Sequence, residues 1–335
     1  MPFSAIIGQE QLKRRLGSFL TGDPGHACLF TGPSGIGKTL AAREYAKALL
    51  CREPSADGAC GHCASCRLFD EGVHPDYREI ASADGKGIKV DQVRSAIVGD
   101  VNMLPQYGSR KVYLVDADYL NEQGQNALLK TLEEPPSYVV LLMTAAGPER
   151  LAGTLVSRMA HLPLARSSPD DIREILKKAG VPADLPALAF LVRYARGIPG
   201  VAKNLAADNW FIQIREDVLD RMAVIGETSR ARLLTDGFSF FNKEKENADD
   251  LLDIAGSWIR DLALASSGTD GDMLLNADRK STILDLVRRN RYDIGQLDRA
   301  ASAVQGARRG LSLNTNFETT ICSLLLQLRK ELAHA

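Results

Sequence analysis

The feature that most constrains this chain is an octapeptide at residues 32–39, Gly-Pro-Ser-Gly-Ile-Gly-Lys-Thr, which matches G-x-x-x-x-G-K-[ST] in full. An apolar run at 27–30 precedes it, and a helical pattern at 39–50 follows it. The glycines let successive backbone N–H groups turn toward one anion, and the N-terminus of the following helix adds its dipole. This context predicts a strand–loop–helix unit that binds phosphate.

All eight positions of this loop are expected to bind a nucleotide such as ATP. Lys38 would reach the β- and γ-phosphates, and Thr39 would ligate Mg²⁺. A second apolar run, 112–115, ends in Asp116, which we expect to hold Mg²⁺ through water. The alternative is a glycine turn that joins a strand to a helix and binds nothing. The expected nucleotide-binding residues of the loop are Gly32, Pro33, Ser34, Gly35, Ile36, Gly37, Lys38 and Thr39.

The first 165 residues alternate short apolar runs with helical patterns, which is typical of an α/β fold with a parallel sheet and crossover helices. Beyond residue 165 the pattern is helical to the end. A helix start at Ser168-Pro169-Asp170-Asp171 and breaks near Gly180 and Gly197 predict a small helical domain at 166–208, followed by an all-α domain at 209–335. Strands are expected at 27–30, 112–115 and 139–144, and helices at 39–50 and 123–134.

Four of the six cysteines crowd into a module at residues 51–66, with the spacing C-x8-C-x2-C-x2-C. The two short steps put three thiolates on tight turns, and four sulfurs in a closed shell suit a tetrahedral structural Zn²⁺. An Fe–S cluster also takes four cysteines and is the alternative that we rank lower. Four unligated thiols are the third option. The expected metal ligands are Cys51, Cys60, Cys63 and Cys66.

The composition is that of an ordinary globular protein, with 45% apolar and 25% charged residues. The formal net charge of −1 provides no global field toward nucleic acid or an anionic membrane. No segment reaches the roughly 18 apolar residues that a spanning helix needs, and the N-terminus lacks a signal-peptide pattern. We therefore expect a cytoplasmic protein, where clustered cysteines indicate a metal site and not disulfides.

Further motifs gather in the first 165 residues. They are Ile7-Gly8-Gln9, His74-Pro75-Asp76, the segment 84–91, and the string Asn126 to Pro136, which is followed by Ser157-Arg158. Together with the phosphate loop and the cysteine module, they resemble the bacterial clamp-loader AAA+ family. The resemblance weakens beyond residue 165, where Asn314-Thr315-Asn316 is a smaller echo.

This resemblance implies an AAA+ P-loop NTPase domain with a parallel sheet, a small helical lid domain and an all-α C-terminal collar domain. It places Ile6 to Gln9, and Ile7 among them, in the lining of the adenine pocket, and Thr144 at the strand end that senses the γ-phosphate. It makes Arg158 an arginine finger that points at ATP bound by a neighbouring subunit, where its guanidinium offsets transition-state charge. The alternative for Arg158 is a surface salt bridge.

Two departures from the family pattern concern hydrolysis. Hydrolysing members usually place Glu directly after the strand-end Asp, and here that residue is Ala117, with Asp118 one further on. Active members also carry an Arg early in a lid helix, where this chain has Gly200. Both changes favour the delta-prime type over the gamma/tau motor, with ATP bound and its hydrolysis weak or absent. A third change, Met159 in place of the usual Cys, is expected to alter packing only.

The resulting hypothesis is a delta-prime-type component of the DNA polymerase III clamp loader, which helps to place the sliding clamp on primed DNA. The resemblance implies gamma/tau and delta subunits, the sliding clamp and primer–template DNA as partners, and no membrane. The alternatives are a hydrolysing gamma/tau-type motor, an unrelated P-loop phosphotransferase and a zinc-finger DNA reader. The last two lack support, because we find neither a small-molecule acceptor constellation nor a basic recognition helix.

Overall fold

The computed structural model describes residues 3–22, 25–82, 85–183, 187–268 and 273–333, so Asp84 of the segment 84–91 lies outside the described residues. The chain divides into two compact units. The first comprises Met1–Lys178 with Arg196–Val201, and the second comprises Ala179–Ala195 with Ala202–Ala335. The boundaries expected at 165 and 208 stay predictions.

Five parallel strands form the sheet of the first unit, in the order β2-β3-β4-β1-β5. Three of them are the strands expected from the sequence, each extended by one or two residues, whereas β2 and β5 were not expected. This sheet confirms the α/β fold class. The strands are β1 (Ala27–Thr31), β2 (Tyr77–Ile80), β3 (Lys111–Asp116), β4 (Val139–Ala145) and β5 (Ala160–Pro163).

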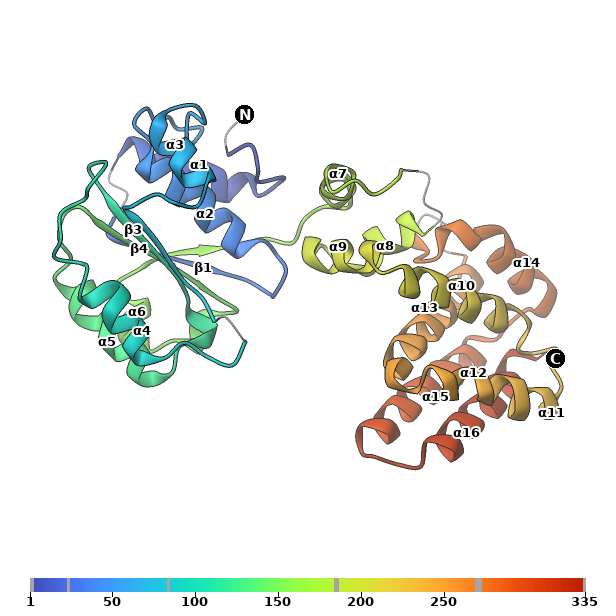
Figure 1. Ribbon diagram of the computed structural model, residues 1–335. Helices are drawn as coiled ribbons and strands as arrows, with labels where there is room; N and C mark the ends of the chain where they lie inside the picture. The colour runs from blue at the N-terminus through green and yellow to red at the C-terminus, as the bar shows by residue number, and fades with distance from the viewer. Residues whose placement is uncertain (1–2, 23–24, 83–84, 184–186, 269–272, 334–335) are drawn as a thin grey trace. The chain divides into compact units, whose positions relative to one another are not determined.

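Helices cover both faces of the sheet, as Figure 1 shows. Alternate residues of each central strand join separate cores: Phe30 packs with α1 and α2, and Leu29 packs with α5 on the opposite face. The helices of this unit are α1 (Glu10–Thr21), α2 (Lys38–Leu50), α3 (Ala64–Asp70), α4 (Val90–Val93), α5 (Glu122–Glu133), α6 (Gly153–Val156) and α7 (Pro169–Lys178), with a π-helical turn η1 at Arg94–Val98 and 3-10 turns at Ala117–Tyr119 and Pro148–Arg150.

The second unit is helical throughout its described residues and has its own core, in which Trp258 and Phe211 are buried. In the last helix, Ile321, Leu324 and Leu328 lie inside this core. Its elements are α8 (Leu188–Tyr194), α10 (Asn209–Val224), α11 (Arg230–Arg232), the π-helical turn η4 (Leu233–Gly237), α12 (Phe238–Lys243), α13 (Ala248–Ser266), α14 (Lys280–Asn290), α15 (Ile294–Ser312) and α16 (Phe317–Leu332), with 3-10 turns at Lys245–Asn247 and Ala277–Arg279; α9 (Pro199–Ala207) has its first three residues in the first unit.

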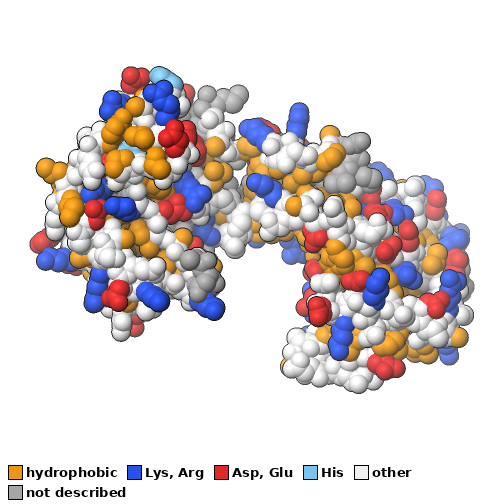
Figure 2. All heavy atoms as spheres, in the orientation of Figure 1, with side chains coloured by type: hydrophobic (Ala, Val, Ile, Leu, Met, Phe, Trp, Pro, Cys, Tyr) orange, Lys and Arg blue, Asp and Glu red, His pale blue; other side chains and the backbone are white. Residues whose placement is uncertain are grey.

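The surface carries charges of both signs. On the face drawn in Figure 2, acidic and basic side chains are interspersed over both units, in keeping with the net charge of −1. None of the helices in the described ranges is long and apolar enough to cross a membrane.

Candidate functional site

The phosphate loop lies where the sequence placed it, between the end of β1 and the start of α2. Gly35 and Gly37 have φ of +78° and +108°, which side-chain-bearing residues rarely adopt. Gly37 is the N-cap of α2, so the loop delivers its backbone amides to a helix N-terminus. The local geometry is that of an anion-binding nest.

Lys38 folds back over this loop. Its ammonium donates hydrogen bonds to the carbonyl oxygens of Gly32 at 2.8 Å and Pro33 at 3.3 Å. A phosphate oxygen is a stronger acceptor than a carbonyl because it is charged. A phosphate bound in the nest would therefore accept the hydrogen bonds that the Lys38 ammonium now donates to the two loop carbonyls.

The carboxyl ends of β3 and β4 bring Asp116 and Thr144 together beside the loop. The Thr144 hydroxyl donates to Asp116 Oδ1 at 3.5 Å. Burial raises the pKa of Asp116, and a backbone hydrogen bond from Asp118 and the positive charge of Lys38 oppose that rise. A carboxylate oxygen is the type of ligand that Mg²⁺ takes, so Asp116 in its ionised form could hold a hydrated Mg²⁺.

Ala117 and Asp118 are the two residues that follow Asp116 at this strand end. Ala117 is buried, and its methyl group cannot accept a proton. The Asp118 carboxylate accepts a hydrogen bond from the backbone N–H of Ala146 at 2.9 Å, which ties the end of β3 to the end of β4. This hydrogen bond from Ala146 to Asp118 holds the carboxyl ends of β3 and β4 together.

Gly200, at the start of α9, touches the phosphate loop backbone to backbone. Its N–H donates to the Gly35 carbonyl at 2.8 Å. A Cβ at this position would lie 2.7 Å from Gly35 Cα, so no larger residue fits without moving the loop. The sequence identified Gly200 as the loss of an arginine. The structure adds that this glycine lets α9 approach the loop.

Residues 6–9 run beside the end of β5. The Gln9 side chain accepts a hydrogen bond from the backbone N–H of Ala165 at 2.9 Å. Ile6 is buried in the core next to α2, and Ile7 is half-buried. The contribution of Ile7 to an adenine pocket stays a prediction.

The four expected cysteines come together. Their sulfurs all lie within 4.8 Å of one another, with Cys51–Cys63 and Cys60–Cys66 each at 3.9 Å. Tetrahedral Zn–S bonds of about 2.3 Å place sulfurs roughly 3.8 Å apart. The backbone N–H groups of Cys60, Cys63 and Cys66 each donate to a cysteine sulfur at 3.3–3.4 Å, as befits sulfur in its thiolate form. The donor set therefore fits a tetrahedral metal ion.

Electrostatics in this cluster also favour a cation. Burial would raise the pKa of Cys63, but backbone hydrogen bonds from Arg52 and Cys66 outweigh it and lower that pKa to about 6. Burial raises the pKa of the Cys51 and Cys66 thiols. Four cysteines deprotonated together at these distances would repel one another, so a divalent ion would supply the positive charge that their thiolate forms need.

A chain of hydrogen bonds joins the cysteine module to the helix before it. Ser65 donates to the Leu50 carbonyl at 2.6 Å, and His74 Nε2 lies 2.9 Å from the Ser65 hydroxyl. Because His74 Nδ1 accepts from the Asp76 backbone N–H at 3.1 Å, the proton of the ring is on Nε2. The His74-Pro75-Asp76 motif thus has a structural role that its sequence did not reveal.

The Asp76 carboxylate has a second structural role. It is fully buried and accepts hydrogen bonds from three successive backbone N–H groups, at Gln106, Tyr107 and Gly108. This arrangement fixes the loop that leads into β3. The sequence pattern around Asp76 did not indicate this role.

Arg158 follows α6 and is partly exposed, at 36% for its side chain. Its guanidinium donates to the Thr154 carbonyl at 2.7 Å and pairs with Glu133 at 3.0 Å. An ion pair this exposed contributes little stability, so the guanidinium can exchange Glu133 for another anion at small cost. The position of Arg158 is therefore compatible with a surface salt bridge to Glu133 and also with an arginine finger.

Comparison with known proteins identifies the first half of the chain. Residues 8–168 match the family described as "DNA polymerase III, delta subunit". A DNA polymerase III subunit delta' of Pseudomonas aeruginosa is 44% identical over 167 residues, which is 46% of this chain and 51% of that protein. The Escherichia coli subunit delta' is 34% identical over 214 residues, covering 63% of each chain.

A third relative, DNA polymerase III subunit tau/gamma of Haemophilus influenzae, is 36% identical over 201 residues, 58% of this chain and 29% of that protein. The chain thus spans about half the length of the first relative and less than a third of this one. All of these similarities describe subunits of one assembly. Residues 8–168 of this chain therefore belong to the family of DNA polymerase III clamp-loader subunits.

Proposed function

We propose that this chain is a delta-prime-type subunit of the clamp loader, which binds ATP and Mg²⁺ with weak or absent hydrolysis of its own. The intact nest at 32–39 and Lys38 support nucleotide binding. The observation that supports weak or absent hydrolysis is the strand end after Asp116. There the buried methyl group of Ala117 cannot accept a proton, and the Asp118 carboxylate is held by a hydrogen bond from the backbone of Ala146.

Arg158 would act in trans on ATP held by a neighbouring subunit. Its partial exposure and its weak ion pair with Glu133 support this role, because a finger must leave its resting partner to meet a phosphate. The finger adds positive charge where the transition state builds negative charge. Arg158 would therefore matter to turnover only in the assembly.

The four-cysteine cluster would hold one structural Zn²⁺. With all four positions taken by sulfur, none is left for a reacting water, so the ion serves the fold of the module at 51–66.

The partners proposed for the chain are gamma/tau and delta subunits, and through the assembly the sliding clamp and primer–template DNA. The subunit would help to place the clamp on primed DNA. The similarity to delta' and tau/gamma subunits supports this assignment. The similarity to tau/gamma also keeps a hydrolysing motor as the alternative.

The test compares the isolated chain with the loader rebuilt from its subunits. We expect the isolated chain to bind ATP in a Lys38-dependent way and to turn it over slowly. In the assembly, Arg158→Ala should lower ATPase activity by about 10³-fold at the site it serves. The exposed Arg150→Ala is the matched control and should change nothing. Rapid, Lys38-dependent hydrolysis by the chain alone would instead identify a gamma/tau-type motor.

A further inference from the structure

A cavity of about 150 Å³ lies within the second unit, among α10, α12, η4 and α16. Its interior is apolar, formed chiefly by Met222, Leu233, Phe241, Leu325 and Leu328, all of them buried. Packed protein interiors rarely leave a void of this size. An engineered cavity of about 150 Å³ lined by similar side chains stays dry and binds benzene. The cavity can therefore take one aromatic ring.

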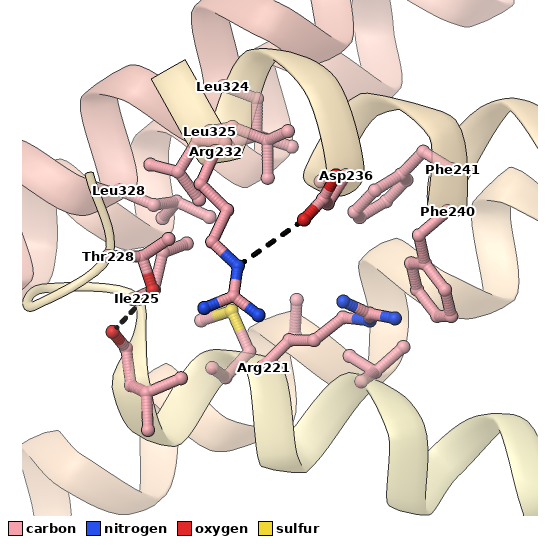
Figure 3. Close-up of a pocket in the computed structure, with 16 residues that line it drawn as sticks. Arg221, Ile225, Thr228, Arg232, Asp236, Phe240, Phe241, Leu324, Leu325 and Leu328 are labelled. Carbon is pink, nitrogen blue, oxygen red and sulfur yellow. Dashed lines mark hydrogen bonds and ion pairs between the residues drawn. The ribbon is translucent and has the colours of Figure 1, made fainter. Parts of the chain in front are cut away.

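Two arginines stand at the rim of this cavity. Both side chains end in the open space drawn in Figure 3, with Leu325 and Leu328 on one side and Phe240 on the other. The Arg221 guanidinium lies over the Phe240 ring at 4.2 Å, and no carboxylate of the described residues pairs with it. Stacking uses the face of a guanidinium, so the N–H groups along its edge stay available for an anion.

The second arginine has only a weak partner. Arg232 pairs with Asp236 at 3.3 Å, and the side chains are 74% and 63% exposed. Such an exposed pair one helical turn apart adds little stability. The rim therefore carries two cations against one anion, and a ligand carboxylate would balance the remaining charge.

The wall between the rim and the interior is irregular. Leu233 to Gly237 form a π-helical turn, a feature that is frequent at functional sites. Leu233 points into the core, whereas Asp236 reaches the rim from the same turn. A Cβ on Gly237 would lie 3.2 Å from Leu325 Cδ1, so the glycine keeps this wall thin.

We propose that this cavity binds a small aromatic carboxylate, with its single ring in the apolar interior and its carboxylate between Arg221 and Arg232. The volume admits one ring and leaves no room for the row of side chains that a docked helix would insert. The inference uses only the second unit and is independent of the clamp-loader assignment.

The proposal is tested with 3-phenylpropanoate on the full-length chain carrying ¹³C-methyl methionine. The chain has six methionines, of which Met222 lines the cavity, while Met143 and Met159 are buried in the first unit. The ring current of a bound aromatic ring should shift the Met222 methyl resonance in a saturable way. The resonances of Met143 and Met159 should stay unmoved.

Two kinds of variant separate the charged rim from the apolar interior. Arg221→Gln and Arg232→Gln should each weaken binding of the carboxylate on the order of tenfold, because each removes a charged donor. Neither should change binding of the neutral analogue 3-phenylpropanol. Arg230→Gln, on α11 outside the cavity lining, is the matched control.

The apolar interior is tested separately with Ala255→Leu, which fills the cavity from α13. This variant should abolish the binding of both probes, provided that circular dichroism shows it to be folded.

Three outcomes would overturn the proposal. The Met222 resonance could stay unmoved up to millimolar probe. The two arginine variants could bind the carboxylate as well as the unchanged protein does. A peptide with a C-terminal phenylalanine could bind while the free acid does not, which would make the cavity a docking site for a chain end.

Discussion

Lys111, the first residue of β3, is a charged side chain inside the first unit. Its side chain is 3% exposed, and its ammonium contacts the carboxylate of Asp100 at 3.1 Å. The Tyr113 hydroxyl donates to the same carboxylate at 2.7 Å. Burial would raise the pKa of Asp100, but the hydrogen bonds from Tyr113 and Lys111 outweigh it and lower that pKa. Asp100 is thus the counter-charge that allows Lys111 to be buried.

Replacing Asp100 with asparagine should destabilise the first unit by on the order of 3 kcal/mol at neutral pH, because Lys111 would be left buried without an anion. A carboxyl whose pKa is lowered by folding stabilises the protein above its unfolded pKa of about 4. That stabilisation is lost as the pH falls through the lower, folded pKa. The difference between Asp100→Asn and the unchanged protein should therefore be full above pH 4 and shrink below it, as measured by urea unfolding.

The matched control is Asp91→Asn, at an exposed position on α4. It should change the free energy of unfolding by no more than about 0.5 kcal/mol. An Asp100→Asn variant as stable as this control would contradict the role assigned to the buried pair.

At the scale of single elements, two glycines in helices should respond oppositely to the same substitution. Gly200→Ala puts a methyl group 2.7 Å from Gly35 Cα, so α9 and the phosphate loop must separate. We expect a loss of about 1–3 kcal/mol in the stability of the first unit. Thermal and urea unfolding would measure it.

Gly306→Ala is the counterpart within α15. Gly306 is exposed, and an added Cβ meets nothing within 4 Å. Alanine in a helix interior is favoured over glycine by about 0.5–1 kcal/mol, so this variant should be more stable. Equal effects of the two substitutions would show that the contact between Gly35 and Gly200 does not constrain the fold.

The elements that the sequence predicted are those with a strong local signal. Gly32 to Thr39 fix a strand–loop–helix junction by themselves, and Pro135 marks where α5 ends. The short strands β2 and β5 escaped, because four residues give too little pattern to recognise. Long-range hydrogen-bond networks were not predicted either. Arg215 is fully buried, and its guanidinium donates to Asp278 at 2.7 Å and to Asn276 at 2.9 Å. These partners lie about sixty residues away in the sequence, so no local spacing connects them to Arg215.

In the candidate site, too, local features were predictable from the sequence and long-range contacts were not. The four cysteines were predictable because their spacing is itself the geometry of a metal site. The engagement of Asp118 with Ala146 and the approach of Gly200 to Gly35 were not, because both depend on how distant segments meet. The cavity beside Arg221 left no sequence signal, since its apolar lining has the same spacing as ordinary core.

The whole molecule has separate hydrophobic cores in its two units. The two clusters that pack against the sheet lie within residues 3–164, and the helical cluster lies within 187–332. Because these clusters share no residue, we expect two transitions in differential scanning calorimetry of the intact chain. A zinc chelator should lower only the transition of the first unit, and Gly306→Ala should raise only the other.

A single transition would contradict this independence. So would a chelator that shifted both transitions equally. Elemental analysis of the same sample should find one zinc per chain before chelation, and Cys60→Ser should reproduce the effect of the chelator, because three sulfurs leave the shell open.

The helix α2 has a distinct task at each of its ends. It starts with Lys38 at the phosphate loop and, after 13 residues, is capped by Cys51 of the sulfur cluster. Such a helix is a stiff rod about 20 Å long. A metal ion bound to Cys51 would restrict translation and rotation of α2. It would thereby help to fix the orientation of Lys38 toward a bound nucleotide. Removal of the metal from the four-cysteine cluster should therefore weaken the nucleotide binding that we propose for Lys38, even though the cysteines lie at the opposite end of the helix.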